Sequence, residues 1–591
     1  MAVTTIYGMF QDTVSRFADR RALAYKVRGT YNHVTYGELN ERVRDFRRGL
    51  AALGVSRGDR VAVLSYNRVE WAVTDLAVHG LGAVLVPVYH TLPPVQVEHY
   101  LRDSGAAVIV VEDAKQYAKI AEVHDRIPAL RHVALMSGDA IEGILSWQGV
   151  VEMGRKSGIA DADLDKAAAS IDPATVATFI YTSGTTGAPK GAMLSHTALL
   201  NTWKAAVQIV RLDETDIFLS FLPLCHVVER VAGHYLPLAI GAQIYYSDGP
   251  FGVANEITTI RPTLFICVPR LFEAIEEKVR EHGAKLPPLR RRIFDWALKT
   301  GEECAAVLRD GGALSPMQAS ARALADKLVL SKVREKVTGG RARYFVSGGA
   351  PLGVGTASLF SGVGVPMLEG YGLTESPVLT LNRPGKARLG TVGTALPGVE
   401  ISIAADGEVL GRGPCLMDGY YNQPEATAAA IDADGWFHTG DIGVIDEHGH
   451  LHITDRKKDI IVLANGKNVA PQPIEARIKR SPFVSEVVLI GDRQNVIHAL
   501  VVPTFDRVKI WAAEQGIAAT EPADLARAPE VIKLIKGEVD RVSQDLADYE
   551  RIRKIALLDH SFTIEGGELT PTLKVKRNIV SQKYGSLLGG G

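Results

Sequence analysis

The segment from Tyr181 to Gly191 reads YTSGTTGAPKG and combines residue types that can bind a phosphate group. Glycines let a ligand approach the backbone closely, serine and threonine hydroxyls donate hydrogen bonds, and Lys190 supplies a positive charge. The segment is neither a Walker A loop nor a G-x-G-x-x-G loop, because Lys190 follows Pro189 and precedes Gly191. A flexible surface loop has a similar composition, so the segment alone leaves a phosphate site and a plain loop both open.

Further polar segments follow apolar stretches. SGGAPL (347–352) comes directly after a buried strand, where an open parallel sheet presents ligands. EGYGLTES supplies Tyr371, which can stack on an adenine ring, and Glu375, which can hold Mg²⁺. DGWFHTGDIG supplies Asp441, which can accept hydrogen bonds from both ribose hydroxyls. A surface ion pair for Glu375 and a turn for Asp441 are the simpler readings of each residue alone.

The elements that must position these groups alternate between strands and helices. The chain reads as a strand at 60–65, a helix at 68–82, a strand at 83–88, a helix at 93–105 and a strand at 106–113. Continuous apolar strands separated by helices are typical of a parallel sheet covered on both faces. The sequence therefore predicts an α/β fold.

Two regions depart from this alternation. Residues 271–335 are mostly amphipathic and helix-forming, with breaks near 285–290 and 310–316, and predict a helical insert. After residue 458, short apolar strands precede a helical stripe that runs from Ile532 to Tyr549. This part predicts a small α+β domain.

Composition indicates a soluble globular protein. The 591 residues include 66 Lys and Arg against 67 Asp and Glu, so no overall charge favours nucleic acid or an anionic membrane. The four cysteines are widely separated, which favours a reducing, cytoplasmic setting over disulfides or a zinc site. We expect no signal peptide and no transmembrane segment, and leave peripheral membrane contact open.

Taken together, the quoted segments resemble the ordered motifs of an acyl-CoA synthetase, a member of the adenylate-forming superfamily that also contains luciferases and peptide-synthetase adenylation domains. The stretch from DGWFHTGDIG to DRKKD is similar to the signature of the fatty acyl-CoA branch. The matching segments, which span most of the chain in family order, are YTSGTTGAPKG, FLPLCHVVER (221–230), SGGAPL, YGLTES, GRGPCLMDGYYNQPEAT (411–427), DGWFHTGD, DRKKDIIV (455–462) and LTPTLKVKR (569–577).

The resemblance implies two domains and a moving catalytic lysine. It implies a large N-terminal domain of parallel and mixed sheets covered by helices (1–457) and a small mobile α+β C-terminal domain (458–591). Lys458 would be the hinge between them and Lys574 the catalytic lysine. Many relatives have glycine immediately before this lysine, whereas Leu573 stands here, so Lys576 remains a rival for the role.

The resemblance also implies a nucleotide site. Thr185 and Glu375 would hold Mg²⁺ and, with Lys574, carry catalysis. His226 lies in the acyl-pocket motif and would face the substrate carboxylate, unless it is an ordinary core histidine. The positions that match the ATP- and AMP-binding residues of the family are Thr182, Ser183, Gly184, Thr185, Thr186, Gly187, Lys190, Gly349, Ala350, Tyr371, Gly372, Thr374, Asp441 and Arg456.

The implied reaction activates a long-chain fatty acid with ATP and passes the acyl group to coenzyme A. The insert at 271–335 resembles that of the long-chain branch, and the apolar stretch after His226 is suited to lining a tunnel for a hydrocarbon chain, so both favour a long chain. Three alternatives remain: a fatty acyl-AMP ligase that supplies a carrier protein, an amino-acid adenylation domain, and a non-catalytic lipid- or nucleotide-binding protein. Whether the chain forms a homodimer is left open.

Overall fold

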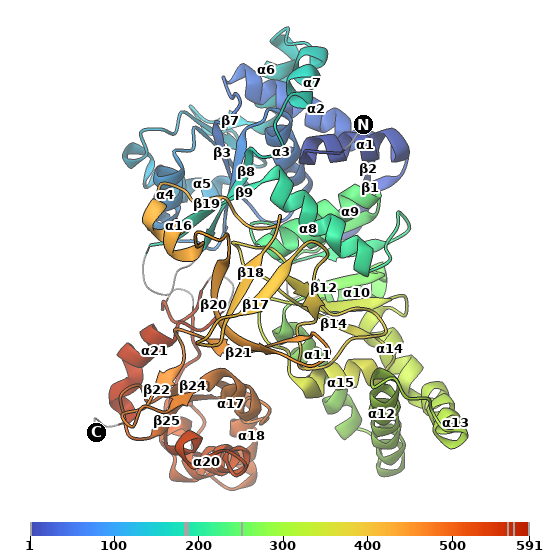
Figure 1. The fold of residues 1–591 in the computed structure, drawn as a ribbon, viewed down its shortest axis with the longest axis vertical. Helices are drawn as coiled ribbons and strands as arrows, with labels where there is room; N and C mark the ends of the chain where they lie inside the picture. Colours follow the sequence, from blue (N-terminus) through green and yellow to red (C-terminus); the bar gives the residue numbers. More distant parts are fainter. Residues whose placement is uncertain (1–2, 183–187, 250–251, 564–565, 571–573, 589–591) are drawn as a thin grey trace.

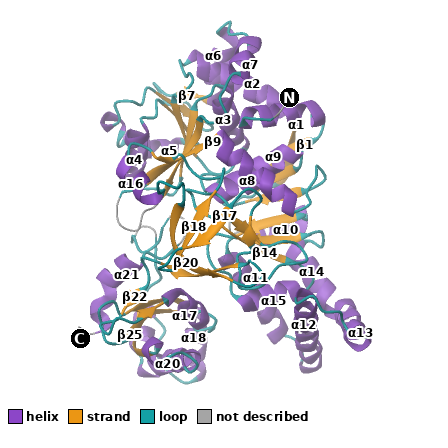
Figure 2. Ribbon diagram, viewed as in Figure 1, coloured by secondary structure: helices purple, strands orange, loops and turns teal. Residues whose placement is uncertain are grey.

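The computed structural model describes residues 3–182, 188–249, 252–563, 566–570 and 574–588. Figure 1 shows two large sheets with their helices in the upper and central parts of the molecule, and the C-terminal part as a separate body below. Strands lie inside and helices outside, as Figure 2 shows. The predicted α/β fold is confirmed.

The first sheet has eight strands, and its centre is parallel, as the alternating pattern predicts. The hairpin of β8 and β9 adds antiparallel pairing at one side. The strands in spatial order are β19 (Gly419–Tyr420), β9 (Lys190–Ser195), β8 (Val176–Thr182), β4 (Val84–Val88), β3 (Arg60–Leu64), β5 (Val108–Val111), β6 (His132–Leu135) and β7 (Leu145–Ser146).

Alternate residues of the central strand β3 pack on opposite faces of this sheet. Val61 and Val63 join one hydrophobic cluster, while Ala62 and Leu64 join another. Helices from the first half of the chain supply the partner side chains, so both faces are covered. These helices are α1 (Ile6–Phe17), α2 (Tyr36–Ala52), α3 (Val69–Gly80), α4 (Pro94–Ser104), α5 (Ala114–Ala121), η1 (His124–Arg126), α6 (Trp147–Lys156), α7 (Asp161–Ala169) and α8 (His196–Ile209).

The second sheet has nine strands and carries three of the predicted ligand-binding segments at its strand ends. Its strands in spatial order are β16 (Thr394–Ala395), β15 (Thr380–Leu381), β14 (Met367–Tyr371), β13 (Tyr344–Ser347), β12 (Leu264–Cys267), β10 (Ile217–Ser220), β11 (Gln243–Tyr246), β1 (Arg21–Val27) and β2 (Thr30–Thr35). The helices nearby are η2 (Glu229–Tyr235), α9 (Leu236–Ile240), α10 (Val253–Ile260) and α15 (Val354–Gly362).

A third, four-stranded antiparallel sheet lies in the centre of the molecule, and the sequence did not predict it. Its strands in order are β17 (Glu400–Ile403), β18 (Glu408–Arg412), β20 (Phe437–Ile445) and β21 (Leu451–Arg456), and α16 (Pro424–Ala430) lies before β20. Asp441 therefore lies within a strand, so its reading as a turn residue is wrong.

The segment predicted to be helical forms a group of helices that breaks at 285–287 and 310–315, close to the predicted places. Its elements are α11 (Pro269–Ala284), α12 (Pro288–Arg309), α13 (Pro316–Ala325), η3 (Asp326–Leu330) and α14 (Ser331–Thr338). None of the helices within the described ranges is long and apolar enough to cross a membrane.

The C-terminal part has its own core, built from residues after 460. The predicted helical stripe is wrong in detail: α20 ends at Ser543, and Val531 rather than Ile532 joins Ile535 and Val539 in the core. The elements are β22 (Ile461–Val462), β23 (Asn468–Val469), α17 (Pro471–Ile478), β24 (Val484–Ile490), β25 (Ile497–Pro503), α18 (Phe505–Glu514), α19 (Pro522–Arg527), α20 (Pro529–Ser543), η4 (Asp548–Glu550), β26 (Ile552–Leu557), α21 (Arg577–Tyr584) and η5 (Gly585–Leu588).

Candidate functional site

The glycine-rich segment connects two paired strands. Thr182 at the end of β8 pairs with Lys190 at the start of β9. The hydroxyl of Tyr181 donates to Oδ2 of Asp103 at 2.7 Å, and Nε2 of His99 lies 2.9 Å from the carbonyl oxygen of Pro189. Both ends of the segment are thus fixed to α4. The predicted phosphate-binding residues Ser183, Gly184, Thr185, Thr186 and Gly187 lie outside the described residues.

Lys190 and Glu375 are brought together by a third side chain, that of Tyr420. The ammonium of Lys190 lies 5.0 Å from the centre of the Tyr420 ring, a cation–π distance. The hydroxyl of Tyr420 donates to Oε1 of Glu375 at 2.7 Å. Strand β19 positions this tyrosine, because Tyr420 pairs with Ala192 of β9. The predicted phosphate-binding lysine and the predicted metal ligand therefore share one partner.

The predicted ribose-binding residues also meet. Asp441 on β20 is the ladder partner of Arg456 on β21, and Nε of Arg456 lies 3.1 Å from Oδ1 of Asp441. The hydroxyl of Tyr371 donates to Oδ2 of Asp441 at 2.6 Å. Burial raises the pKa of Asp441, although the Arg456 charge opposes that shift. Tyr371 thus holds the aspartate with its hydroxyl, while its ring is half-buried.

Lys574 reaches this site from the C-terminal part of the chain. Desolvation and the positive charge of Arg456 lower the pKa of Lys574 to about 8, while the carboxylates of Asp441 and Glu375 act in the opposite direction. The backbone that carries it is tied down, because the amide of Lys574 donates to Oγ1 of Thr570 at 3.0 Å. The lysine therefore lies within electrostatic reach of the predicted ribose and metal-binding residues.

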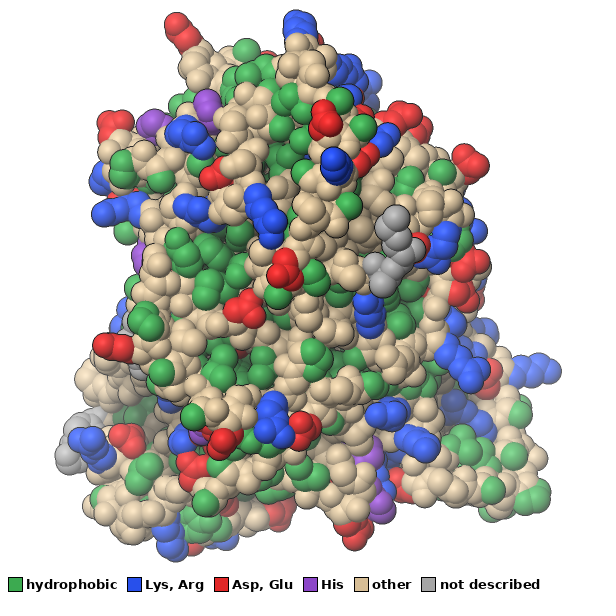
Figure 3. All heavy atoms as spheres, turned by 45° about the horizontal axis from the view of Figure 1, so that its top comes forward, with side chains coloured by type: hydrophobic (Ala, Val, Ile, Leu, Met, Phe, Trp, Pro, Cys, Tyr) green, Lys and Arg blue, Asp and Glu red, His purple; other side chains and the backbone are tan. Residues whose placement is uncertain are grey.

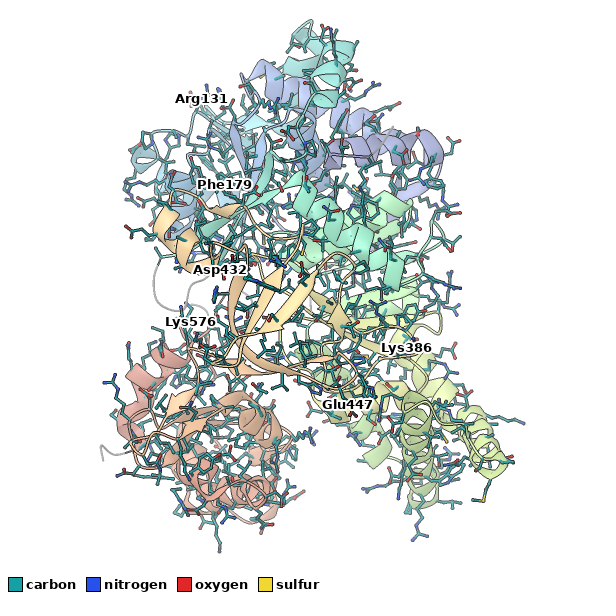
Figure 4. The ribbon with its side chains drawn as sticks, in the orientation of Figure 1. Arg131, Phe179, Lys386, Asp432, Glu447 and Lys576 are labelled. Carbon is teal, nitrogen blue, oxygen red and sulfur yellow. The ribbon has the colours of Figure 1, made fainter. Side chains whose placement is uncertain are left out.

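The rival lysine is placed differently. Lys576 precedes the first residue of α21, and its amide donates to the carbonyl oxygen of Glu568 at 2.7 Å. Figure 4 labels it at the edge of the C-terminal body that faces the rest of the molecule. Within the described ranges, neither Lys576 nor Lys574 forms an ion pair with the nucleotide-site residues.

His226 lies near Lys574, and the lysine charge together with burial lowers its pKa to about 4, with burial the larger cause. Nδ1 of His226 accepts a hydrogen bond from the amide of Val228 at 3.3 Å. A neutral imidazole that accepts at Nδ1 carries its proton on Nε2, so His226 can donate at that atom. His226 therefore lies within electrostatic reach of Lys574.

The remaining predicted residues lie after the ends of β13 and β14, and no side-chain hydrogen bond joins them to another described residue. Gly349 follows β13 and has a φ of 81°, a conformation that favours glycine, and Ala350 is exposed beside it. A Cβ on Gly372 would lie 2.2 Å from the carbonyl oxygen of Pro377, so only glycine fits. Thr374 is half-buried in the same loop.

The predicted hinge lies beside a firmly held residue. Nζ of Lys457 lies 2.9 Å from Oε2 of Glu408, the first residue of β18, and 2.6 Å from Oδ2 of Asp406 just before that strand. The next residue, Lys458, is exposed in a turn, and no ion pair joins it to another described residue. The chain passes from one body to the other through this turn. Ion pairs also join the two bodies, because Arg270 of α11 pairs with Glu486 of β24 at 3.1 Å.

The wall next to His226 contains a buried acid that sequence reasoning missed. Glu229 begins the π-helix η2, is almost fully buried and accepts a hydrogen bond from Oγ of Ser220 at 2.5 Å. Burial raises its pKa to about 8, against the opposing effect of Ser220. Glu229 is therefore neutral near pH 7.

Sequence reasoning also missed Tyr420, although it quoted the segment that contains it. Nothing in the letters of that segment distinguishes Tyr420 from its neighbour Tyr421, whose ring stacks on Phe179 at 4.5 Å. Only the pairing of β19 with β9 shows which of the two faces the site.

Comparison with protein families gives two matches along the chain. The sequence profile described as AMP-binding enzyme matches residues 10–421. The profile described as AMP-binding enzyme C-terminal domain matches residues 458–588.

Individual relatives match over nearly the full length. The long-chain-fatty-acid–CoA ligase FadD15 of Mycobacterium bovis is 36% identical over 94% of this chain and 92% of its own. The long-chain-fatty-acid–CoA ligase ACSBG2 of Xenopus laevis is 32% identical over 98% of this chain and 82% of its own. The adenylation domain of a carboxylate reductase from Mycobacterium chelonae superposes with a TM-score of 0.76 at 23% identity, covering 99% of this chain and 91% of that one.

Proposed function

Because the chain belongs to the family of AMP-binding, adenylate-forming enzymes, we propose that it is a long-chain fatty acid–CoA ligase. It would convert a fatty acid, ATP and coenzyme A into acyl-CoA, AMP and pyrophosphate. The observation that carries the proposal is that Lys574, which comes from the C-terminal body, interacts electrostatically with Asp441, Arg456 and Glu375.

In the first step the fatty carboxylate attacks the α-phosphorus of ATP. A P–O bond forms to the acid, and the P–O bond to pyrophosphate breaks. Asp441, held by Tyr371 and Arg456, would orient the ribose, and Lys574 would neutralise negative charge that develops at the α-phosphate. Nε2 of His226 would donate to the carboxylate and orient it.

Glu375 suits a divalent cation. Its side chain is largely buried, Tyr420 holds one oxygen, and no hydrogen bond to another described residue engages the second. A carboxylate oxygen is a ligand that Mg²⁺ prefers, and Thr185 would be the other protein ligand. Bound there, Mg²⁺ would supply charge neutralisation for the triphosphate.

In the second step the thiol of coenzyme A attacks the acyl carbonyl. A C–S bond forms, the C–O bond to AMP breaks with its electron pair on the phosphate oxygen of AMP, and the thiol proton passes to solvent. A lysine at the α-phosphate is not needed for this step, so rotation about Lys458 would withdraw Lys574 and open a path for the thiol. Lys458 suits a pivot because it lies between anchored Lys457 and the C-terminal body.

Relatives named for long-chain fatty acids support that substrate class. The residues on either side of His226 in the sequence, Cys225 and Val227, are buried and apolar, which suits a hydrocarbon substrate. A fatty acyl-AMP ligase is the second candidate, because the adenylation site would look the same. A non-catalytic protein is disfavoured, since Lys574 and its partners are assembled.

The test is product analysis with ATP, Mg²⁺, coenzyme A and a ladder of fatty acids from eight to twenty-four carbons. The proposal expects AMP, pyrophosphate and acyl-CoA in equal amounts, with turnover highest for long chains. Acyl-adenylate without thioester would establish the acyl-AMP ligase instead. Failure of fatty acid to support pyrophosphate–ATP exchange would overturn the proposal altogether.

A further inference from the structure

The exposed hydrophobic side chains of this protein are concentrated on one group of helices. We call residues 288–338, which form α12, α13, η3 and α14, the helical spur; Figure 1 shows α12 and α13 projecting from the sheets at the lower right. Single exposed apolar residues are normal, whereas a concentration of them marks an interaction surface. Seven of the eighteen large hydrophobic residues that are exposed in the described ranges lie there: Leu289, Ile293, Trp296, Leu308, Met317, Leu324 and Leu328.

On α12 these side chains form a stripe. Leu289, Ile293 and Trp296 follow one another at steps of four and three residues, which places them on one face of a helix. Leu289 is 71% exposed, while the opposite face of α12 buries Phe294 and Leu298 against the protein. The helix is thus apolar on both sides, and only one side has a partner within the described chain.

The second stripe lies on the continuous helix formed by α13 and η3. Met317, Leu324 and Leu328 recur at steps of seven and four residues, and Met317 is 81% exposed. Helix α13 buries only Ala325 among its own residues. Packing against the protein therefore does not explain why these positions are apolar.

The same helix continues into a cationic pocket of about 350 Å³. Lys332 and Lys336 of α14 line it together with Arg261, whose Nε donates to the carbonyl oxygen of Gly339 at 2.6 Å. Glu335 is the one carboxylate among the lining residues. No ion pair with any described residue neutralises either lysine, so the pocket carries net positive charge and suits a phosphate group.

More cations flank the apolar stripe of α12. Arg290, Arg291 and Arg292 follow Leu289 directly. Arg291 lies 3.7 Å from Asp295, whereas no described acidic side chain pairs with Arg290 or Arg292. Figure 3 shows hydrophobic and basic side chains together at its lower right, where the spur lies.

We propose that the helical spur docks on the surface of an anionic phospholipid bilayer. Apolar side chains next to cations are the combination that an interfacial surface needs, because the former enter the acyl boundary and the latter meet phosphate headgroups. Trp296 suits the headgroup level. A second copy of this chain would bring the same excess of cations to the contact, which disfavours it as the occupant. The proposal concerns binding and does not depend on the reaction.

The test uses the full-length protein and sedimentation with vesicles of phosphatidylcholine alone or with phosphatidylglycerol. Binding should require phosphatidylglycerol and weaken with salt. The double variant Lys332→Glu/Lys336→Glu should bind at least about tenfold more weakly, since each cation near an anionic surface contributes roughly fivefold. The triple variant Met317→Ser/Leu324→Ser/Leu328→Ser should lose at least as much. All these positions are exposed, so the variants should fold, which circular dichroism checks.

Matched control variants come from the C-terminal body. Lys509→Glu/Lys533→Glu carries the same charge change on exposed positions, and Ile510→Ser/Ile532→Ser removes exposed apolar side chains. Both controls should bind like the wild type. The absence of vesicle binding, or an equal loss in control and spur variants, overturns the proposal.

A second measurement asks whether the spur enters the bilayer. A nitroxide on Met317→Cys should become accessible to oxygen and shielded from water-soluble relaxers when vesicles are added, whereas one on Ile510→Cys should not change. The native cysteines are buried, so labelling should be selective. Sedimentation velocity without vesicles tests whether the spur is a dimer interface. If the protein dimerises, the spur variants abolish the dimer and vesicles do not shield the label, the surface binds a second copy of the chain instead.

Discussion

The hydroxyl of Tyr420 donates a 2.7 Å hydrogen bond to Oε1 of Glu375, and the two residues are 45 positions apart. The same tyrosine ring faces the ammonium of Lys190 at 5.0 Å. One side chain therefore fixes the positions of a cation and an anion that would both meet the triphosphate.

Tyr420→Phe should keep the ring and lose the hydrogen bond to the carboxylate. Because a hydrogen bond to a charged group contributes about 1.5–3 kcal/mol, we expect the rate of pyrophosphate–ATP exchange to fall roughly 10- to 100-fold, with a higher Mg²⁺ requirement. Tyr421→Phe is the matched control, since its ring stacks on Phe179. Equal effects of the two changes would contradict the assignment.

Lys574→Ala should separate the two half-reactions. Without the ammonium near the α-phosphate, adenylation should fall by about 10²–10³, the cost of removing a group that stabilises transition-state charge. Formation of thioester from supplied acyl-adenylate should change less than about threefold. Single-turnover assays of each step provide the measurement.

The control for that experiment is Lys576→Ala, which should leave adenylation within about threefold of the wild type. If Lys576→Ala abolishes adenylation while Lys574→Ala does not, the roles of the two lysines are reversed. Loss of both half-reactions in Lys574→Ala would show a structural role.

Adenylation should also depend on pH through Lys574. Its pKa is lowered to about 8, and a lysine is charged only below its pKa. Adenylation kcat/KM should therefore fall as pH rises through 8, about tenfold per pH unit above it. His226, with a pKa of about 4, stays neutral across this range. In Lys574→Arg the decline should disappear, because arginine keeps its charge; a decline that persists would assign it to another group.

Glu229 should make stability depend on pH. The folded protein raises its carboxyl pKa from 4.5 to about 8, so the folded state binds more protons than the unfolded state between these values. Stability should fall with rising pH across this window by about 1.4 kcal/mol per unit from this group. Glu229→Gln keeps the shape and the contact with Ser220 but does not titrate. Its melting temperature relative to the wild type should rise from pH 5 to pH 8.5; a constant difference would contradict the shift.

The pattern of apolar residues along the sequence was sufficient to predict the strands and helices of the α/β body. Alternating apolar strands and helices gave β3, α3 and β4 within two residues, because each element there is stabilised by its own burial pattern. The sequence also predicted correctly that SGGAPL and YGLTES begin where β13 and β14 end. The family resemblance added the residue roles that periodicity does not contain.

What the sequence did not contain were pairings between distant strands. The ladder that joins Asp441 to Arg456 belongs to an antiparallel sheet, and the sequence of its strand β20, FHTGDIGVI, does not alternate apolar and polar residues. Tyr420 faces the site only because β19 pairs with β9. Lys574 and Lys576 are the same residue type two positions apart, and the family resemblance was the reason for preferring Lys574. In the structure, the charges of Asp441, Arg456 and Glu375 act on Lys574.

The anchoring of Lys457 has a consequence for intermediates. Asp441 and Arg456 precede the exposed turn at Lys458. A rotation of the C-terminal body would therefore move Lys574 away and leave the Asp441–Arg456 pair in place. A mixed anhydride formed in the first half-reaction would remain seated throughout the swing, sheltered from hydrolysis until sulfur arrives.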